Sequence, residues 1–160
     1  MDLNELVAGF AEKTGLGALT PDDEGMYWLK IDEYAVGLGE DAEARVLVVH
    51  APIAERNEES AAALAETLLE LNLLYLGTQG GSIALDREAG LYFYQRREPL
   101  DALDVERFTA LIEAFVNRTE ELSNRIAEFV RMYAEAGTIA EAKAAEERSL
   151  GGLSSGFMQV

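Results

Sequence analysis

The sequence has no cysteine, one histidine and few basic residues. The absence of cysteine excludes disulfides and thiol catalysis, and one histidine without thiolates makes a zinc site unexpected. Thirteen Lys and Arg stand against 30 Asp and Glu, giving a net charge of -17. Nucleic acids and anionic membranes are bound by clustered basic side chains, so we expect neither as a partner. A basic or apolar partner fits this charge better.

Long apolar runs are also missing. No segment approaches the ~20 residues that a transmembrane helix needs. The first residues, MDLNELVAGFAEKTG, are acidic where a secretory signal would be basic. We therefore expect a soluble, cytoplasmic protein. A chain of 160 residues should form one domain, or one domain with a tail.

The spacing of apolar residues predicts helices and strands in alternation. A helix follows Asp2 and ends at TGLG, and a second begins at Glu58 or Ser60 and ends at GTQGG. A third follows Asp104, runs from Val105 to about Tyr133, and ends by Gly137. The strands are predicted at 26–31, 34–39, 45–53, 82–86 and 90–95.

Strands joined by hairpins predict an antiparallel twisted sheet. The order α-β-β-β-α-β-β-α places the chain in the α+β class. We expect residues 1–134 to form the domain and residues 135–160 to form a polar helix and a flexible C-terminal tail. The third helix would be about 45 Å long at ~1.5 Å per residue. Such a helix exceeds the body, so it should bend, fray or meet another subunit.

The sequence offers little for catalysis. His50 lies in the apolar stretch LVVHAP, and a catalytic base needs a nucleophile and an orienting group nearby. No serine elbow is present, so a structural histidine is favoured. The acidic clusters DDE and ERNEE lack the ligand spacing of a calcium loop, and GTQGGS lacks the lysine and helix of a phosphate loop. We expect no catalytic residue, metal or cofactor.

Several predicted strands are apolar on both faces. Met26 and Trp28 alternate with Tyr27 and Leu29, and the later strand GLYFYQ shows the same pattern. One face must meet the helices. The other face needs a second subunit or a partner, unless the three helices wrap the sheet on both sides.

This pattern resembles the class I type III secretion chaperones, the Tir-chaperone-like family. The likeness is clearest in GMYWLKIDEYAVGL, in LLELNLLYLGTQGGSIALDREAGLYFYQ and in PLDALDVERFTALIEAFVNRTEEL. It covers about residues 1–134, and the remaining 25 or so residues exceed the usual family tail. The resemblance implies a homodimer without enzymatic activity. Such a dimer binds an extended apolar segment near the N-terminus of a secreted effector and keeps it soluble and secretion-competent without nucleotide.

The resemblance also implies two sets of residues. The effector groove, built from the first helix and the adjoining sheet, would use Leu6, Phe10, Trp28, Leu29, Ile31 and Val48. The dimer interface, built from the second helix and the strand after it, would use Leu68, Leu71, Leu74, Tyr75, Ile83 and Leu85. For each residue, a place in the monomer core is the alternative.

Two other functions stay open. A YbjN-like bacterial regulatory or stress protein would have the same fold without a role in secretion. A small hydrolase would use His50 and the acidic cluster.

Overall fold

The computed structural model describes the backbone of residues 1–154 and the side chains of residues 1–145. Its elements follow the predicted order, with two short 3-10 turns added. They are α1 (Leu3–Thr14), β1 (Tyr27–Ile31), β2 (Tyr34–Asp41), β3 (Val46–Glu55), α2 (Ala61–Asn72), η1 (Leu73–Tyr75), β4 (Ser82–Asp86), β5 (Leu91–Pro99), η2 (Leu100–Ala102) and α3 (Val105–Ser154).

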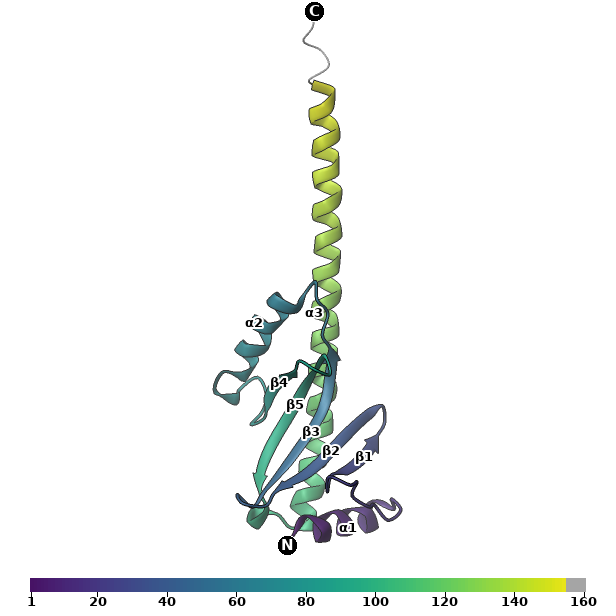
Figure 1. Cartoon of the computed structure of the whole chain (residues 1–160), viewed down its shortest axis with the longest axis vertical. Coiled ribbons are helices and arrows are strands. Elements are labelled where there is room, and N and C mark those ends of the chain that lie inside the picture. Colours follow the sequence, from purple (N-terminus) through teal and green to yellow (C-terminus); the bar gives the residue numbers. More distant parts are fainter. Residues whose placement is uncertain (155–160) are drawn as a thin grey trace, which may run out of the picture.

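The five strands form one antiparallel sheet in the order β1-β2-β3-β5-β4. Helix α3 passes behind this sheet, with α1 beside it near the base and α2 to one side next to β4 (Figure 1). The predicted α+β class and antiparallel sheet are confirmed. Strand β5 is longer than predicted because its polar end, Arg96 to Pro99, continues to pair with β3.

Local signals set the helix starts. Asp2 and Glu5 form a reciprocal capping box at the start of α1, and Gly15 closes that helix with φ 72°. At the start of α3, the Arg107 amide donates to the Asp104 carboxylate at 2.8 Å. Asp104 therefore caps this helix as predicted.

The core lies between one face of the sheet and the helices. Alternate strand residues enter it, including Leu29, Val36, Leu47 and Val49, all at most 1% exposed. The Tyr94 ring stacks on Phe115 of α3 with centroids 4.8 Å apart, and Phe10 of α1 meets Phe108 edge to face at 5.7 Å. The first contact ties α3 to the sheet, and the second ties α1 to α3.

The predicted end of the third helix at Gly137 is wrong. Helix α3 continues through Gly137 to Ser154, a run of 50 residues and about 75 Å at ~1.5 Å per residue. One glycine costs a helix only ~1 kcal/mol, and the strong helix former alanine recurs on both sides of it. The helix projects far beyond the body (Figure 1). The expected flexible tail begins within this helix, and its residues 155–160 lie outside the described residues.

Two glycines in helices should respond oppositely to alanine. A Cβ at Gly9 of α1 would lie 2.5 Å from Val105 Cγ2, whereas a Cβ at Gly137 would meet nothing within 4 Å. We expect Gly9→Ala to lower the free energy of unfolding by ~1–3 kcal/mol through overpacking. We expect Gly137→Ala to raise helix content, because alanine favours helix by ~1 kcal/mol. Urea denaturation and far-UV circular dichroism measure both, and a stable Gly9→Ala protein would contradict the close packing of α1 on α3.

Candidate partner-binding site

The outer face of the sheet, opposite the core, carries a cross-strand row that is aromatic toward β1 and polar toward β4, with Met26 and Phe93 beside it. Strand register aligns Trp28, Gly37, His50, Gln95 and Ser82 across all five strands. Trp28 is 48% exposed, and the His50 ring lies edge to face with Trp28 at 5.4 Å and with Phe93 at 5.8 Å. The aromatic side chains thus form a connected surface on the face that points away from α1 and α3.

Glycines on β2 shape this surface. A Cβ at Gly37 would lie 2.4 Å from His50 Cε1, and a Cβ at Gly39 would lie 2.4 Å from Met26 Sδ. Any other residue at these positions would push the His50 ring or the Met26 thioether off the sheet. The two glycines let these groups lie flat across β2.

Hydrogen bonds hold the edge of the row. The Trp28 indole donates to Asp22 Oδ2 at 2.8 Å, and the Met26 amide donates to Asp22 Oδ1 at 2.9 Å. These bonds, the indole first, lower the pKa of Asp22 below 3.8. The indole is therefore held in place while Trp28 stays half exposed. At the other end of the row is a depression of about 530 Å³, lined by His50, Ala84, Leu85, Asp86, Arg87, Phe93 and Gln95.

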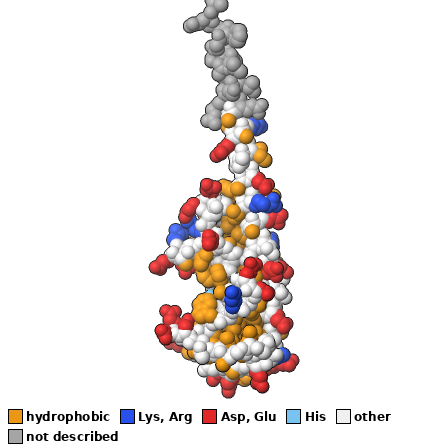
Figure 2. All heavy atoms as spheres, turned by 90° about the vertical axis from the view of Figure 1, so that its right-hand side faces the viewer, with side chains coloured by type: hydrophobic (Ala, Val, Ile, Leu, Met, Phe, Trp, Pro, Cys, Tyr) orange, Lys and Arg blue, Asp and Glu red, His pale blue; other side chains and the backbone are white. Residues whose placement is uncertain are grey.

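A second groove runs beside the β1 edge, between α1 and α3. It has a volume of about 460 Å³ and is lined by Phe10, Thr14, Leu16, Lys30, Ile31, Asp32, Ile112, Glu113, Val116 and Asn117. Figure 2 views the molecule from the side of Figure 1 that carries β1. Apolar side chains gather there on the body, and acidic side chains surround them.

The two edges of the sheet differ. On β4, the Asn72 amide donates to the Ile83 carbonyl at 3.0 Å and accepts from the Ile83 amide at 2.8 Å. Asn72 thus takes the place of a neighbouring strand. Within the described residues, no side chain bonds to the backbone of β1 in this way. An unpaired edge is a template for strand addition, so β1 is the edge open to an extended peptide.

The predicted groove residues separate into two groups. Leu6 and Leu29 are buried in the core, at 0% and 1% exposed. Phe10 is also buried but lines the groove beside β1, as does the half-buried Ile31. Trp28 and Val48 lie on the outer face. Sequence reasoning missed Met26, His50 and Phe93 as members of this surface, although their alternation with core residues was a usable signal.

The predicted dimer residues also separate. Leu68 and Ile83 are buried, Leu71 is half-buried, and Leu85 is 38% exposed. Leu74 and Tyr75 belong to a strongly exposed cluster, which we call the leucine patch. Its members, 60–79% exposed, are Leu69, Leu73, Leu74, Tyr75 and Leu76.

The leucine patch is held in a specific shape. Leu74 and Tyr75 have φ of 53° and 58°, which is unusual for bulky residues and costs of order 1–3 kcal/mol each. The buried Arg118 guanidinium donates to the Gly77 carbonyl, and the Tyr94 hydroxyl donates to the Thr78 carbonyl at 2.8 Å. Anchored from the core in this way, the patch presents its side chains outward.

Other kinds of site find little support. No group of three or more potential metal ligands occurs in the described part of the chain. Across the same residues, no helix has the length and hydropathy to cross a bilayer. The ring neighbours of His50 are Trp28 and Phe93, which supply neither a nucleophile nor an orienting group.

Comparison with known proteins gives a family and a fold. The model of the Tir chaperone protein (CesT) family matches residues 5–123, whereas a search of curated protein sequences finds no match. The crystal structure of the ExsC–ExsE complex is similar with a TM-score of 0.67 and 25% identity, over 78% of this chain and 96% of that chain. The HopA1–SchA chaperone–effector complex gives 0.64 and 22%, over 74% and 91%. The Yersinia pestis type III secretion chaperone SycH, solved with a stable fragment of YscM2, gives 0.59 and 18%, over 74% and 98%.

The position of His50 predicts a pH dependence of stability. Burial lowers the pKa of His50 below 6.5, so the unfolded chain binds this proton more readily than the folded chain. The difference in pKa therefore contributes to the free energy of unfolding. This contribution is complete above about pH 6.5 and is lost as the pH falls toward the pKa of His50 in the folded state. His50→Gln should remove this loss. Urea denaturation of both proteins at about pH 7.5 and about pH 5.5 measures it, and parallel pH profiles would contradict the prediction.

Proposed function

Because this chain belongs to the Tir chaperone protein (CesT) family, we propose that it is a class I type III secretion chaperone. It binds an extended apolar segment near the N-terminus of a secreted effector in the bacterial cytoplasm. It keeps that segment soluble and competent for secretion, and it uses no nucleotide. The observation that supports this proposal most directly is the apolar outer face of the sheet, which adjoins an open strand edge.

The recognition chemistry follows from those two features. A segment added along β1 would gain backbone hydrogen bonds, which do not depend on sequence. Its side chains would alternate between two sides of the sheet. One set would lie beside Trp28 on the outer face, and the other would lie beside Ile31 in the groove toward α3. The site therefore selects apolar residues at alternate positions.

Charge sets the flanking preference. Acidic side chains lie around the apolar side chains on the β1 side of the body (Figure 2), and the whole chain carries a net charge of -17. An effector segment with basic residues around its apolar core would be attracted at long range. Salt would weaken this attraction, since surface charges are screened within ~8 Å at physiological ionic strength.

We further propose a homodimer formed through the leucine patch. The patch comprises five large apolar residues in a fixed conformation, and a soluble monomer rarely exposes so many together. It lies beside β4, the capped edge, so a second copy there would leave β1 open. Each dimer would then offer two effector sites.

Effector binding can be tested by co-expression with secreted proteins encoded by neighbouring genes. Pull-down and protease mapping should show one protected segment near the N-terminus of such a protein. Trp28→Glu should weaken its binding at least tenfold, ~1.4 kcal/mol, because it puts a charge on the apolar row. Thr138→Glu, which adds the same charge on the exposed far part of α3, is the control. If no secreted protein is stabilised or co-purified, the proposed function is wrong.

Dimerisation has its own test. Leu74→Glu places a charge in the centre of the leucine patch and should abolish the association made through the patch, which lowers the sedimentation coefficient in sedimentation velocity. Leu16→Glu changes another exposed leucine, outside the patch, and should sediment as the unaltered protein does. The same profile for Leu74→Glu and the unaltered protein would place the interface elsewhere.

A further inference from the structure

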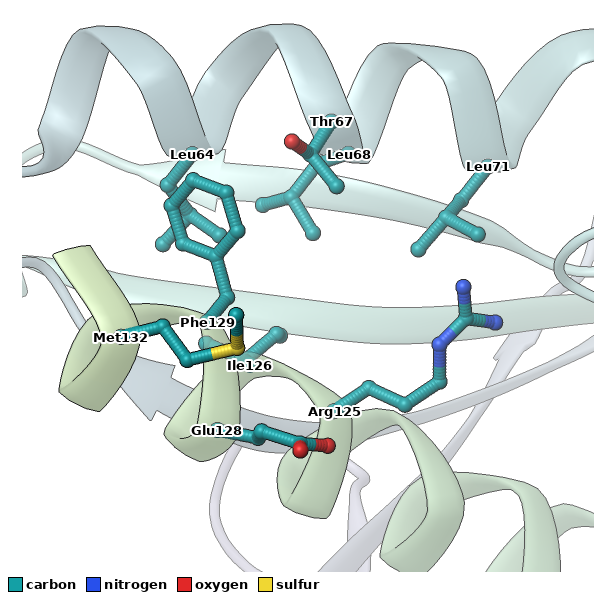
Figure 3. Close-up of a pocket in the computed structure, with 9 residues that line it drawn as sticks. All are labelled: Leu64, Thr67, Leu68, Leu71, Arg125, Ile126, Glu128, Phe129 and Met132. Carbon is teal, nitrogen blue, oxygen red and sulfur yellow. The ribbon is translucent and has the colours of Figure 1, made fainter.

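A groove between α2 and α3, which we call the helical groove, lies apart from the proposed effector site. Helix α2 supplies Leu64, Thr67, Leu68 and Leu71, and α3 supplies Arg125, Ile126, Glu128, Phe129 and Met132. Its volume is about 210 Å³. Figure 3 shows the leucines on one side, Phe129, Met132 and Ile126 on the other, and Arg125 and Glu128 at the rim.

The α3 wall of the helical groove is an addition to the family's shared part. The family match ends at residue 123, and every α3 residue that lines the groove follows it. The rest of α3, residues 133–154, which we call the arm, follows in turn. The α3 wall of the groove and the arm are therefore continuous on one helix, and both follow the part of this chain that the family model matches.

The described part of the arm projects away from the body of its own chain (Figure 1). All residues from 131 to 145 are exposed, including Met132 at 58% and Ile139 at 68%. Isolated helices are marginal in water, and most gain their stability by packing an amphipathic face. Such a face exists here: Phe129, Met132, Ala136, Ile139 and Lys143 follow one another at spacings of three and four. This row begins with groove residues and continues along the arm.

Charges indicate how a second copy would fit. In an antiparallel pair, the register that sets Ile139 of one copy against Met132 of the other also sets Lys143 against Glu128. Lys143 follows Ile139 by four residues and Glu128 precedes Met132 by four residues, so the two meet in an antiparallel pair. Glu128 and Lys143 have no ion-pair partner within the described part of their own chain. A parallel pair in register would instead set Glu128 against Glu128 and Lys143 against Lys143, and both pairs would repel.

We propose that the arm of one copy packs antiparallel against α3 of a second copy and fills its helical groove, and that the second copy does the same in return. The contact is isologous and closed, so it uses both arms and both grooves at once. The small side chain of Ala140, which lies opposite Arg131 in this register, lets the arm approach the shallow groove closely. The contact is separate from the proposed leucine-patch dimer, because Leu69 lies around α2 from Leu64 and Leu71.

A charge exchange tests this contact, in a protein that also carries Leu74→Glu so that the leucine patch does not contribute. Glu128→Lys and Lys143→Glu should each weaken self-association at least about tenfold at low ionic strength, because each reversal creates two repulsive pairs. The double variant should restore it. All these side chains are exposed, so folding should be unaffected. Sedimentation equilibrium measures the association, and unaltered association in the single variants, or no restoration in the double variant, would overturn the proposal.

A disulfide test locates the contact, since the chain has no cysteine of its own. Thr67→Cys in one tagged copy and Lys143→Cys in another should give an intermolecular disulfide on mild oxidation. Thr138→Cys is the control, because two residues beyond Ala136 it points about 200° away around the helix. Oxidation in the presence of a co-purified effector is the second arm of the experiment. A disulfide from Thr67→Cys to a native or introduced cysteine of the effector, or none to Lys143→Cys, would show that the second copy is not the occupant. Effector binding itself, measured separately, does not depend on this result.

Discussion

The packing of α3 on one face of the sheet is the constraint on which the rest of the molecule depends. Alternate side chains along each strand are buried against the helices, and Tyr94, which stacks on Phe115, is one of them. Helix α1 adds to the same face through Phe10 and Phe108. Since the helices lie on one side, the other side of the sheet keeps its apolar row uncovered. The surface proposed for partner binding is thus a consequence of which face of the sheet the helices cover.

The same packing controls the shape of the leucine patch. Tyr94 reaches from the core to the Thr78 carbonyl, and Arg118 of α3 reaches the Gly77 carbonyl. Through these bonds, the central strand and the long helix determine the path of the loop that follows η1. A substitution in the core near Tyr94 should therefore alter the conformation of the leucine patch, although Tyr94 is not a member of the patch. Asn72 adds a third link, because it holds the β4 edge at Ile83.

The sequence was sufficient for the order and type of the elements, because periodicity and capping residues are local. Asp2, Gly15 and Asp104 each act within one helical turn, and each was found. The sequence was insufficient to predict which face of each strand is buried. Alternation separates Trp28 from Leu29, but only the position of α3 decides which of them is buried. Leu29 was assigned to the effector groove for this reason, and it lies in the core, as does Leu6 of α1.

The predicted end of the third helix was wrong for a different reason. Glycine was taken as a stop signal at Gly137, yet a glycine ends a helix only where the chain gains something by leaving it. No αL turn or capping contact is available there, and the alanines on either side favour continuation. The signal for the arm lay instead in the row from Phe129 to Lys143, whose spacing does not change at Gly137. An unbroken amphipathic row of this kind is better evidence for a helix that meets a partner than the composition of the segment is for a flexible tail.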